Sequence, residues 1–171
     1  MGMEIEHKFL VSPKINLVGC EKFEAYHGYI HLAEPTVSQM RVVWNATKHK
    51  GRINIKGNRT GASRLEYEYE IPEEEAKKMI IELKLPVIHK TRHKKMENGN
   101  EWAIDVYHDS NAGLMIAELE IPYEGYVFTK PEWALTDVTE CDRYYNRCLL
   151  DTPYCEWRGT DKDLILNCLS N

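Results

Sequence analysis

The sequence has no apolar run of about 18 residues, which is the length that a membrane-spanning helix needs. Its first residues, MGMEIEHKFLV, also lack a basic stretch followed by an apolar one, so they predict no secretory signal. The five cysteines are odd in number and show no CxxC spacing, which is typical of free thiols in a reducing compartment. We therefore expect a cytoplasmic protein that has no membrane partner.

An excess of positive charge is also missing. Lysine and arginine number 22 against 27 for aspartate and glutamate, which makes the net charge −5. Proteins that bind nucleic acid are normally basic, so this balance argues against a nucleic-acid partner. The chain also lacks repeats, low-complexity stretches and linker-like segments, and 171 residues fit one domain. We expect residues 1–171 to form that single domain.

What the sequence does contain is charge that recurs at every second position within short segments. Alternation with a period of two indicates β-strands that have one polar and one apolar face. The segments with this pattern are residues 4–10, 52–56, 64–71, 101–107 and 117–121. The Asn98-Gly99 pair, between residues 88–96 and 101–107, favours a tight hairpin.

Helical patterns are fewer. In residues 73–85 the apolar side chains repeat at the spacing i, i+3, i+4 and i+7, and Pro72 and three glutamates occupy the expected start. Residues 139–150 and 160–169 are also expected to be helical, with Pro153 between them. The chain is therefore expected to be mainly β, with a few helices (α+β).

The polar faces of the strand-like segments carry both charge signs at close spacing. A solvated outer face also mixes signs, so each segment alone fits that simpler interpretation. Taken together, the opposite faces are rich in Trp, Tyr and Ile, which favours a closed antiparallel barrel. In that barrel the polar faces line the interior and the helices pack outside.

The segment Glu4-Ile5-Glu6-His7-Lys8 resembles the E-x-E-x-K signature of the CYTH superfamily, the triphosphate tunnel metalloenzymes. Further motifs follow in the family's order: GYI at 28–30, INIKG at 53–57, SRLEYEYEIP at 63–72, KTR at 90–92, IDVYHDSNAG at 104–113, AELEIP at 117–122 and RYYN at 143–146. The set covers nearly the whole chain and is most similar to the short, single-domain bacterial members. The resemblance implies an eight-stranded antiparallel tunnel.

One motif departs from the family. Where the family usually has R-x-R, this chain has the sequence SQMRVV at residues 38–43, with one arginine, Arg41. Either Gln39 or Val43 occupies the other arginine position, depending on where the longer loop at residues 45–51 is placed. Gln39 is favoured, because its polarity suits a polar interior. One phosphate-binding charge is therefore expected to be absent.

The resemblance implies a substrate site made of six cationic side chains. Arginine can hold two phosphate oxygens at once, and lysine acts as a point charge. The residues implied as phosphate ligands are Lys8, Arg41, Lys56, Arg64, Lys90 and Arg92. The simpler interpretation of each residue alone is a solvated charge on a strand.

The resemblance also implies that acidic side chains bind Mg²⁺ or Mn²⁺, since bare carboxylates would repel a polyanion and hard divalent ions prefer oxygen ligands. The implied metal ligands are Glu4, Glu6, Glu66, Glu68, Asp105, Glu118 and Glu120. The alternative is ion pairing with Lys and Arg across strands. Because like charges would crowd an empty tunnel, we also expect replacing Glu118 and Glu120 by Gln to raise the stability of the free protein.

The favoured function is a metal-dependent hydrolase that cleaves the terminal phosphoanhydride of a triphosphate, with inorganic tripolyphosphate preferred over a nucleoside or organic triphosphate. Lys8 with Tyr29 is expected to orient or deprotonate the attacking water, and Glu6 to take part in catalysis. The alternatives are an adenylate cyclase and a non-catalytic polyphosphate- or nucleotide-binding module. The assembly is expected to be a monomer or homodimer.

Overall fold

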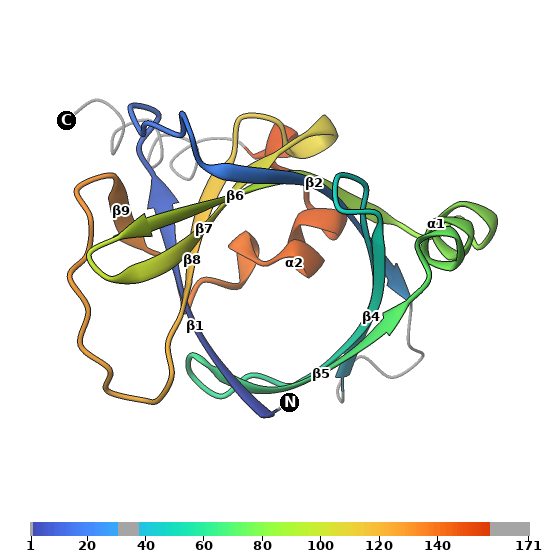
Figure 1. The fold of residues 1–171 in the computed structure, drawn as a ribbon, viewed down its shortest axis with the longest axis horizontal. Helices are drawn as coiled ribbons and strands as arrows, with labels where there is room; N and C mark the ends of the chain where they lie inside the picture. Colours follow the sequence, from blue (N-terminus) through green and yellow to red (C-terminus); the bar gives the residue numbers. More distant parts are fainter. Residues whose placement is uncertain (1, 31–37, 158–171) are drawn as a thin grey trace.

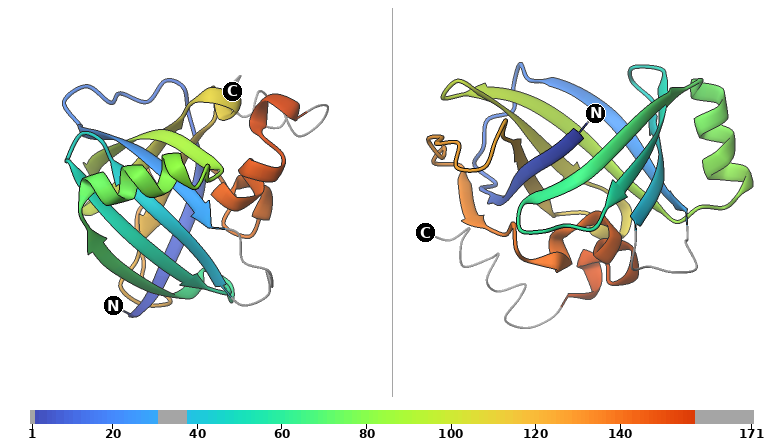
Figure 2. Two further views of the ribbon diagram at one scale, coloured as in Figure 1. Left: turned by 90° about the vertical axis from the view of Figure 1, so that its right-hand side faces the viewer. Right: turned by 90° about the horizontal axis from the view of Figure 1, so that it is seen from below.

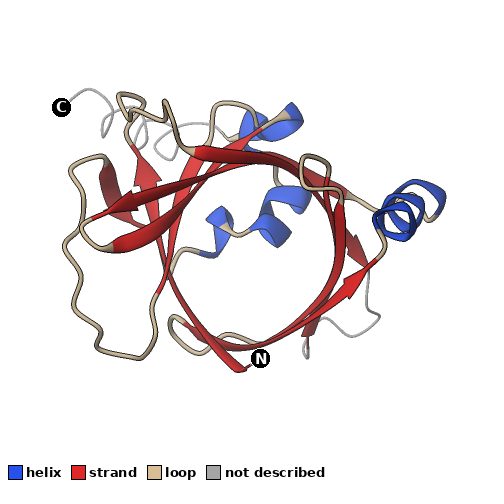
Figure 3. Ribbon diagram, viewed as in Figure 1, coloured by secondary structure: helices blue, strands red, loops and turns tan. Residues whose placement is uncertain are grey.

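The computed structural model describes residues 2–30 and 38–157, so the helix predicted at residues 160–169 lies outside the described part of the chain. Its main element is a closed barrel of antiparallel strands (Figures 1 and 3). The barrel strands are β1 (Gly2–Val11), β2 (Glu21–Ile30), β3 (Ser38–Asn45), β4 (Lys50–Gly57), β5 (Ser63–Ile71), β6 (Val87–Glu97), β7 (Asn100–Tyr107) and β8 (Met115–Glu120).

The strands follow the order β5-β4-β3-β2-β6-β7-β8-β1, and a pairing of β5 with β1 closes the ring. A ninth strand, β9 (Ala134–Asp137), pairs with the end of β1 and is not needed for closure. The predicted eight-stranded closed antiparallel barrel is therefore confirmed. The predicted hairpin is also confirmed, because Asn98 and Gly99 join β6 to β7 with φ angles of 51° and 78°.

One sector of the outer barrel wall is apolar and covered. Phe9, Trp102 and Ile104 are buried there, on strands β1 and β7. The chain between β8 and β9 packs over them, with ring centroids 5.9 Å apart for Trp102 and Phe128 and 5.2 Å apart for Trp102 and Trp133. Because successive side chains of a strand point to opposite faces, burying this apolar face outside turns the charged face inward.

The helix α1 (Glu73–Glu82) lies outside the barrel against β3 and β4 (Figure 1). Its buried side chains Ala76 and Ile80 pack with Val42 of β3. The helix comes close to β4 at Gly51. Any larger residue there would place its Cβ atom 2.7 Å from the Cβ of Ala76, which is too close for two carbon atoms. The helix is shorter than the predicted 73–85, because Lys84 has a φ of 51° and the chain turns there towards β6.

The end of the described chain covers one end of the barrel. It forms two short 3₁₀ turns, η2 (Asp142–Tyr144) and η3 (Tyr154–Glu156), on either side of the helix α2 (Asn146–Asp151). In Figure 1 α2 overlaps the interior of the ring, and the side views of Figure 2 place it at one end.

This arrangement corrects one prediction, because the helix expected over 139–150 is limited to α2 and the turn before it. The two helices pack against different parts of the strand wall: α1 lies against its side, and α2 covers one end. Tyr29, Ile88 and Tyr107 form an apolar cluster at this end of the barrel, and Leu149 of α2 packs into that cluster.

Two smaller findings bear on the sequence analysis. No helix among the described residues combines the length and the apolarity that crossing a membrane would take. The cysteines within the described ranges, Cys20, Cys141, Cys148 and Cys155, are free thiols.

Candidate active site

Inward-facing side chains from all eight barrel strands enclose a cavity of about 800 Å³. The predicted site residues that line it are Glu4, Glu6, Lys8, Tyr29, Arg41, Lys56, Arg64, Glu66, Glu68, Lys90, Arg92, Glu118 and Glu120. Asp105 is the exception, because it is completely buried in the wall behind two of the cations. The strand register interleaves the two charge signs, for example by placing Glu4 opposite Arg64 and Lys8 opposite Glu118.

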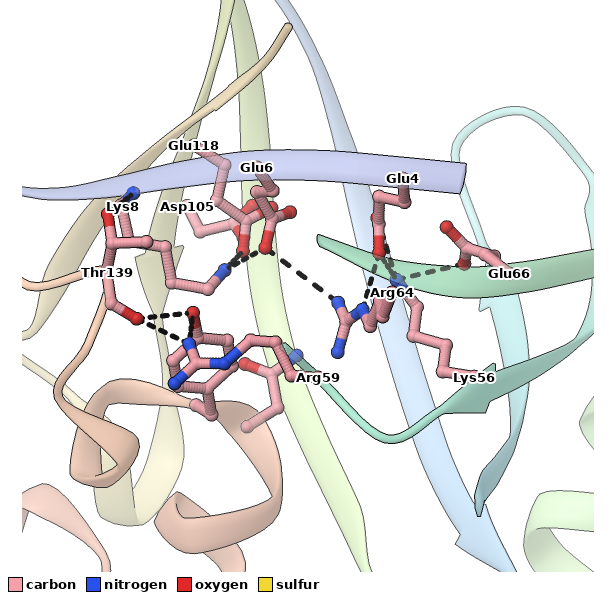
Figure 4. Close-up of polar contacts among 12 residues, drawn as sticks. Glu4, Glu6, Lys8, Lys56, Arg59, Arg64, Glu66, Asp105, Glu118 and Thr139 are labelled. Atoms are coloured by element: carbon pink, nitrogen blue, oxygen red, sulfur yellow. Dashed lines mark hydrogen bonds and ion pairs between the residues drawn. The ribbon is translucent and has the colours of Figure 1, made fainter. Parts of the chain in front are cut away.

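Lys8 lies between two carboxylates (Figure 4). Its Nζ atom is 2.7 Å from Glu6 and donates a hydrogen bond to Glu118, and its side chain is buried. Burial alone would lower the pKa of Lys8, but Glu118 and Glu6 outweigh it, and the pKa lies above its usual value. Lys8 is therefore a protonated donor in the free protein.

A second cluster joins β1, β4 and β5. The Nζ atom of Lys56 lies 2.9 Å from Glu4 and 2.9 Å from Glu66, and Nε of Arg64 donates to Glu4 over 2.5 Å (Figure 4). Burial lowers the pKa of Lys56, and so do the positive charges of Arg41 and Arg64, although Glu4 and Glu6 oppose the shift. The ammonium group of Lys56 therefore lies where an additional anion is electrostatically favoured.

The third cluster is the most deeply buried. Asp105 of β7 accepts hydrogen bonds from Lys90 and from both Nε and Nη2 of Arg92, the latter two at 2.6 Å. Arg92 also reaches Glu118. Burial together with the charge of Arg92 lowers the pKa of Lys90 to about 8, even though Asp105 and Glu118 oppose the shift. Lys90 is therefore a cation whose charge needs a nearby anion.

The remaining predicted residues are placed less deeply. Glu68 has a side chain that is 42% exposed, and it pairs with Arg52 at 3.0 Å near the edge of the cavity. Burial raises the pKa of Glu120, and so do the negative charges of Glu4 and its neighbours Glu66 and Glu6. Glu120 therefore lies where a cation is electrostatically favoured.

Tyr29 lies beside Arg41, its cross-strand partner on β3. The ammonium group of Lys8 contacts Glu6, Glu118 and the ring of Tyr145, whose centroid lies 4.8 Å from Nζ. Tyr29 and Lys8 thus share the cavity, and within the described part of the chain no contact between their side chains is seen. Their joint catalytic role stays a prediction.

Gln39 and Val43 both face the cavity, on either side of Arg41. Gln39 is exposed and lies opposite Lys56, whereas Val43 is buried and lies opposite Arg52. Both arginine positions of the family motif are therefore interior positions, and the preference for Gln39 stays a prediction.

Three residues in or next to the cavity wall were not predicted as site residues from the sequence. Arg59, in the loop between β4 and β5, donates hydrogen bonds to the Thr139 carbonyl and the Tyr145 hydroxyl. Its guanidinium carbon lies 4.3 Å from the ring centroid of Tyr145, so that ring contacts both Arg59 and Lys8. A loop has no periodicity that could have revealed Arg59. His27 and Asn54, in contrast, share the inward faces of β2 and β4 and could have been found from the alternation.

The donor atoms fit a divalent cation, although their arrangement in the free protein does not yet form a site. Among the described residues, no group of three or more His, Cys, Asp or Glu side chains is placed to hold a metal ion. The predicted alternative, ion pairing across strands, accounts for the carboxylates as they stand. The acids are nevertheless hard oxygen donors, and Glu120 is surrounded by like charge. The chemistry of the donor set therefore fits a hard divalent cation.

Comparison with known proteins places the chain in a family. It is 41% identical over 155 residues to an inorganic triphosphatase of Acetivibrio thermocellus, covering 90% of this chain and 97% of the relative. It is 30% identical over 152 residues to an inorganic triphosphatase of Nitrosomonas europaea, covering 85% and 95%. A crystal structure of an inorganic triphosphatase has the same fold, with a TM-score of 0.63, 24% identity, and coverage of 91% and 97%. No family model matches the chain. Its closed barrel, ordered motifs and close relatives show that the chain belongs to the CYTH-type inorganic triphosphatase family.

Proposed function

We propose that the protein cleaves the terminal phosphoanhydride bond of inorganic tripolyphosphate inside the barrel, with Mg²⁺ or Mn²⁺. The observation that supports this most is the burial of three lysines, Lys8, Lys56 and Lys90, in the wall of one cavity. Lysine is almost never buried without a partner, and among the described residues the ion-pair partners of these lysines are carboxylates of the same cavity wall. A polyanion that enters the cavity replaces those carboxylates as the counter-charge.

The acids released in this way, Glu4, Glu6, Glu66 and Glu118, are the proposed metal ligands together with Glu120, which lies among their charges. A bound divalent ion would neutralise phosphate charge and lower the pKa of a bound water. Glu68 and Asp105 were predicted as ligands too. Glu68 would act from the edge of the cavity, whereas Asp105 is bonded to Lys90 and Arg92 and so orients the two cations.

The chain's own residues bind and orient the substrate. Arg41, Arg64 and Arg92 present planar guanidinium groups to the cavity, and such groups can contact two phosphate oxygens each. Lys8, with its raised pKa, is a donor in the free protein. It is therefore suited to orienting water or to stabilising a developing phosphate charge, and not to removing a proton from water.

We expect tripolyphosphate to give a kcat/KM at least about tenfold higher than ATP, because an adenosine group would have to be accommodated among buried charges. Phosphate release from tripolyphosphate, ATP, thiamine triphosphate and longer polyphosphate, each with Mg²⁺ and with Mn²⁺, measures this. Activity that persists in chelator would contradict the metal requirement. Accumulation of cyclic AMP at the rate of ATP loss would instead identify a cyclase, and binding without turnover a binding module.

The departure from the family motif gives a second prediction. Gln39→Arg adds a charge to an exposed interior position, and a hydrogen bond to a charged group contributes about 1.5–3 kcal/mol. We expect its kcat/KM for tripolyphosphate to rise about tenfold. Val43→Arg is expected to give no gain, because the new cation would be buried opposite Arg52. A gain from Val43→Arg alone would show that position 43 holds the missing charge.

The cytoplasmic location and the monomeric or homodimeric state remain predictions. Size-exclusion chromatography with light scattering would decide the second.

A further inference from the structure

His27 is a buried histidine in the cavity wall that the mechanism above does not use. It lies on β2 with its side chain turned into the barrel, and it is only 6% exposed. Its Nδ1 atom is buried and has no hydrogen-bond partner within residues 2–30 and 38–157. Buried polar atoms are nearly always paired, and leaving one unpaired is destabilising. An unpaired ring nitrogen in the wall of a ligand cavity points to a role in binding.

The position of His27 coincides with a gap in the ring of cations. Its cross-strand partner on β3 is Val43, which with Gln39 is one of the two alternative positions for the second arginine of the family motif. Val43 is apolar and 5% exposed, so it offers phosphate no hydrogen bond. Arg52 faces Val43 from the other side, on β4, but its guanidinium pairs with Glu68. His27 is therefore the polar side chain on β2 next to the gap.

The charges around His27 are mostly positive. They come from Arg41 on β3 and from Lys90 and Arg92 on β6, with Glu118 on β8 as the opposing charge. Burial lowers the pKa of His27 well below its usual value, and these three cations lower it further. The ring is therefore neutral in the free protein at neutral pH. A polyphosphate in the cavity would reverse the sign of the surrounding charge and favour the imidazolium.

We propose that His27 is a further phosphate-binding residue, which supplies a cation beside the apolar interior position 43 by taking up a proton from solvent when a polyphosphate enters the barrel. The same proton returns to solvent when the ligand leaves. This inference rests on the proposed function, since it requires polyphosphate to bind in the cavity. Its consequence is a protein whose affinity for its ligand depends on pH through one interior histidine.

The test measures proton uptake directly. Tripolyphosphate is titrated calorimetrically into the protein in chelator, in buffers of different ionisation enthalpy, so that binding occurs without turnover. Three proteins are compared: the wild type, His27→Gln, and His93→Gln as the matched control. His93 is a histidine of β6 that does not line the cavity. We expect the wild type and His93→Gln to take up close to one proton more than His27→Gln, which should bind about tenfold more weakly.

The pH dependence has a defined sign. Because the pKa of His27 is higher in the complex than in the free protein, His27 strengthens binding most at low pH. That contribution is lost as the pH rises through the pKa of the complex. Between about pH 6 and about pH 8, the affinity of the wild type should fall more steeply than that of His27→Gln.

Each outcome decides between the two proposals. Equal proton uptake by the wild type and His27→Gln, with equal affinity, overturns the role of His27 and leaves the proposed function intact. A wild type that binds no tripolyphosphate in chelator overturns the role of His27, whereas the proposed function requires a divalent cation and is decided by phosphate release with Mg²⁺ or Mn²⁺. If His27→Gln does not fold, NMR titration of the His27 ring in the wild type gives the same answer, because the proposal requires tripolyphosphate to raise its titration midpoint. An unchanged midpoint overturns it.

Discussion

Replacing Asp105 by Asn is expected to lower the free energy of unfolding by about 3–5 kcal/mol, the usual effect of breaking a buried ion pair. Asp105 is 0% exposed and bonds two cations, one of which, Lys90, is 1% exposed. Asparagine has the same shape but no charge. The substitution removes a negative charge that balances Lys90 and Arg92, in a region where burial and the charge of Arg92 already lower the pKa of Lys90 to about 8. Urea unfolding measures the loss.

The control is Glu101→Gln on the same strand. Glu101 pairs with Lys94 at 2.6 Å, but its side chain is 52% exposed, so we expect a loss below about 1 kcal/mol. The double variant Asp105→Asn with Lys90→Met removes the uncompensated cation and should recover part of the stability. A loss for Asp105→Asn no larger than that for Glu101→Gln would show that Asp105 does not stabilise the buried cluster.

Replacing Glu118 and Glu120 one at a time by Gln is expected to abolish turnover in both cases and to change stability in opposite directions. Glu118 accepts hydrogen bonds from Lys8 and Arg92. Burial alone would raise its pKa, but Arg92, Lys8 and Lys90 hold it well below its usual range. The charged form of Glu118 therefore stabilises the fold, and Glu118→Gln should lower the melting temperature.

Glu120 is the opposite case. Burial and the charges of Glu4, Glu66 and Glu6 raise its pKa, so its ionisation is unfavourable in the free protein. Glu120→Gln should raise the melting temperature slightly. The sequence-based expectation that both substitutions stabilise the empty barrel is thus revised for Glu118, because Lys8 and Arg92 already balance that charge.

The pH dependence of stability gives a further test of Glu118. Since the pKa of Glu118 is lowered by folding, its stabilising effect is present above the unfolded pKa of about 4.3 and is lost as pH falls through the lower folded value. Melting temperatures and phosphate release, with Glu70→Gln at the exposed end of β5 as control, test both effects. Wild-type turnover by either variant would exclude that carboxylate from the metal site, and equal changes in melting temperature would contradict the charge arrangement.

Much of the fold could be predicted because the barrel strands have a period of two that is strong and local. Segments such as 4–10 and 64–71 show it within a few residues, and the Asn98-Gly99 turn fixes the hairpin that joins β6 to β7. The helix predicted over residues 139–150 differed most from the structure, in which α2 begins at Asn146. Short helices are marginal without tertiary contacts. The extent of α2 therefore depends on the apolar cluster that Leu149 enters, which no local pattern reveals.

The sequence by itself determined which side chains share a face, because alternation puts Glu6 with Lys8 on one strand and Glu118 with Glu120 on another whichever strands are neighbours. Only the tertiary structure decided that these faces point inward and which of their charges meet. Lys8 and Glu118 are 110 positions apart, and their pairing follows from the register between β1 and β8. The tertiary structure likewise buried Asp105 behind Lys90 and brought His27 next to Val43. The physical reason is that periodicity is a local property of a chain, whereas burial and charge pairing depend on the register of the closed barrel.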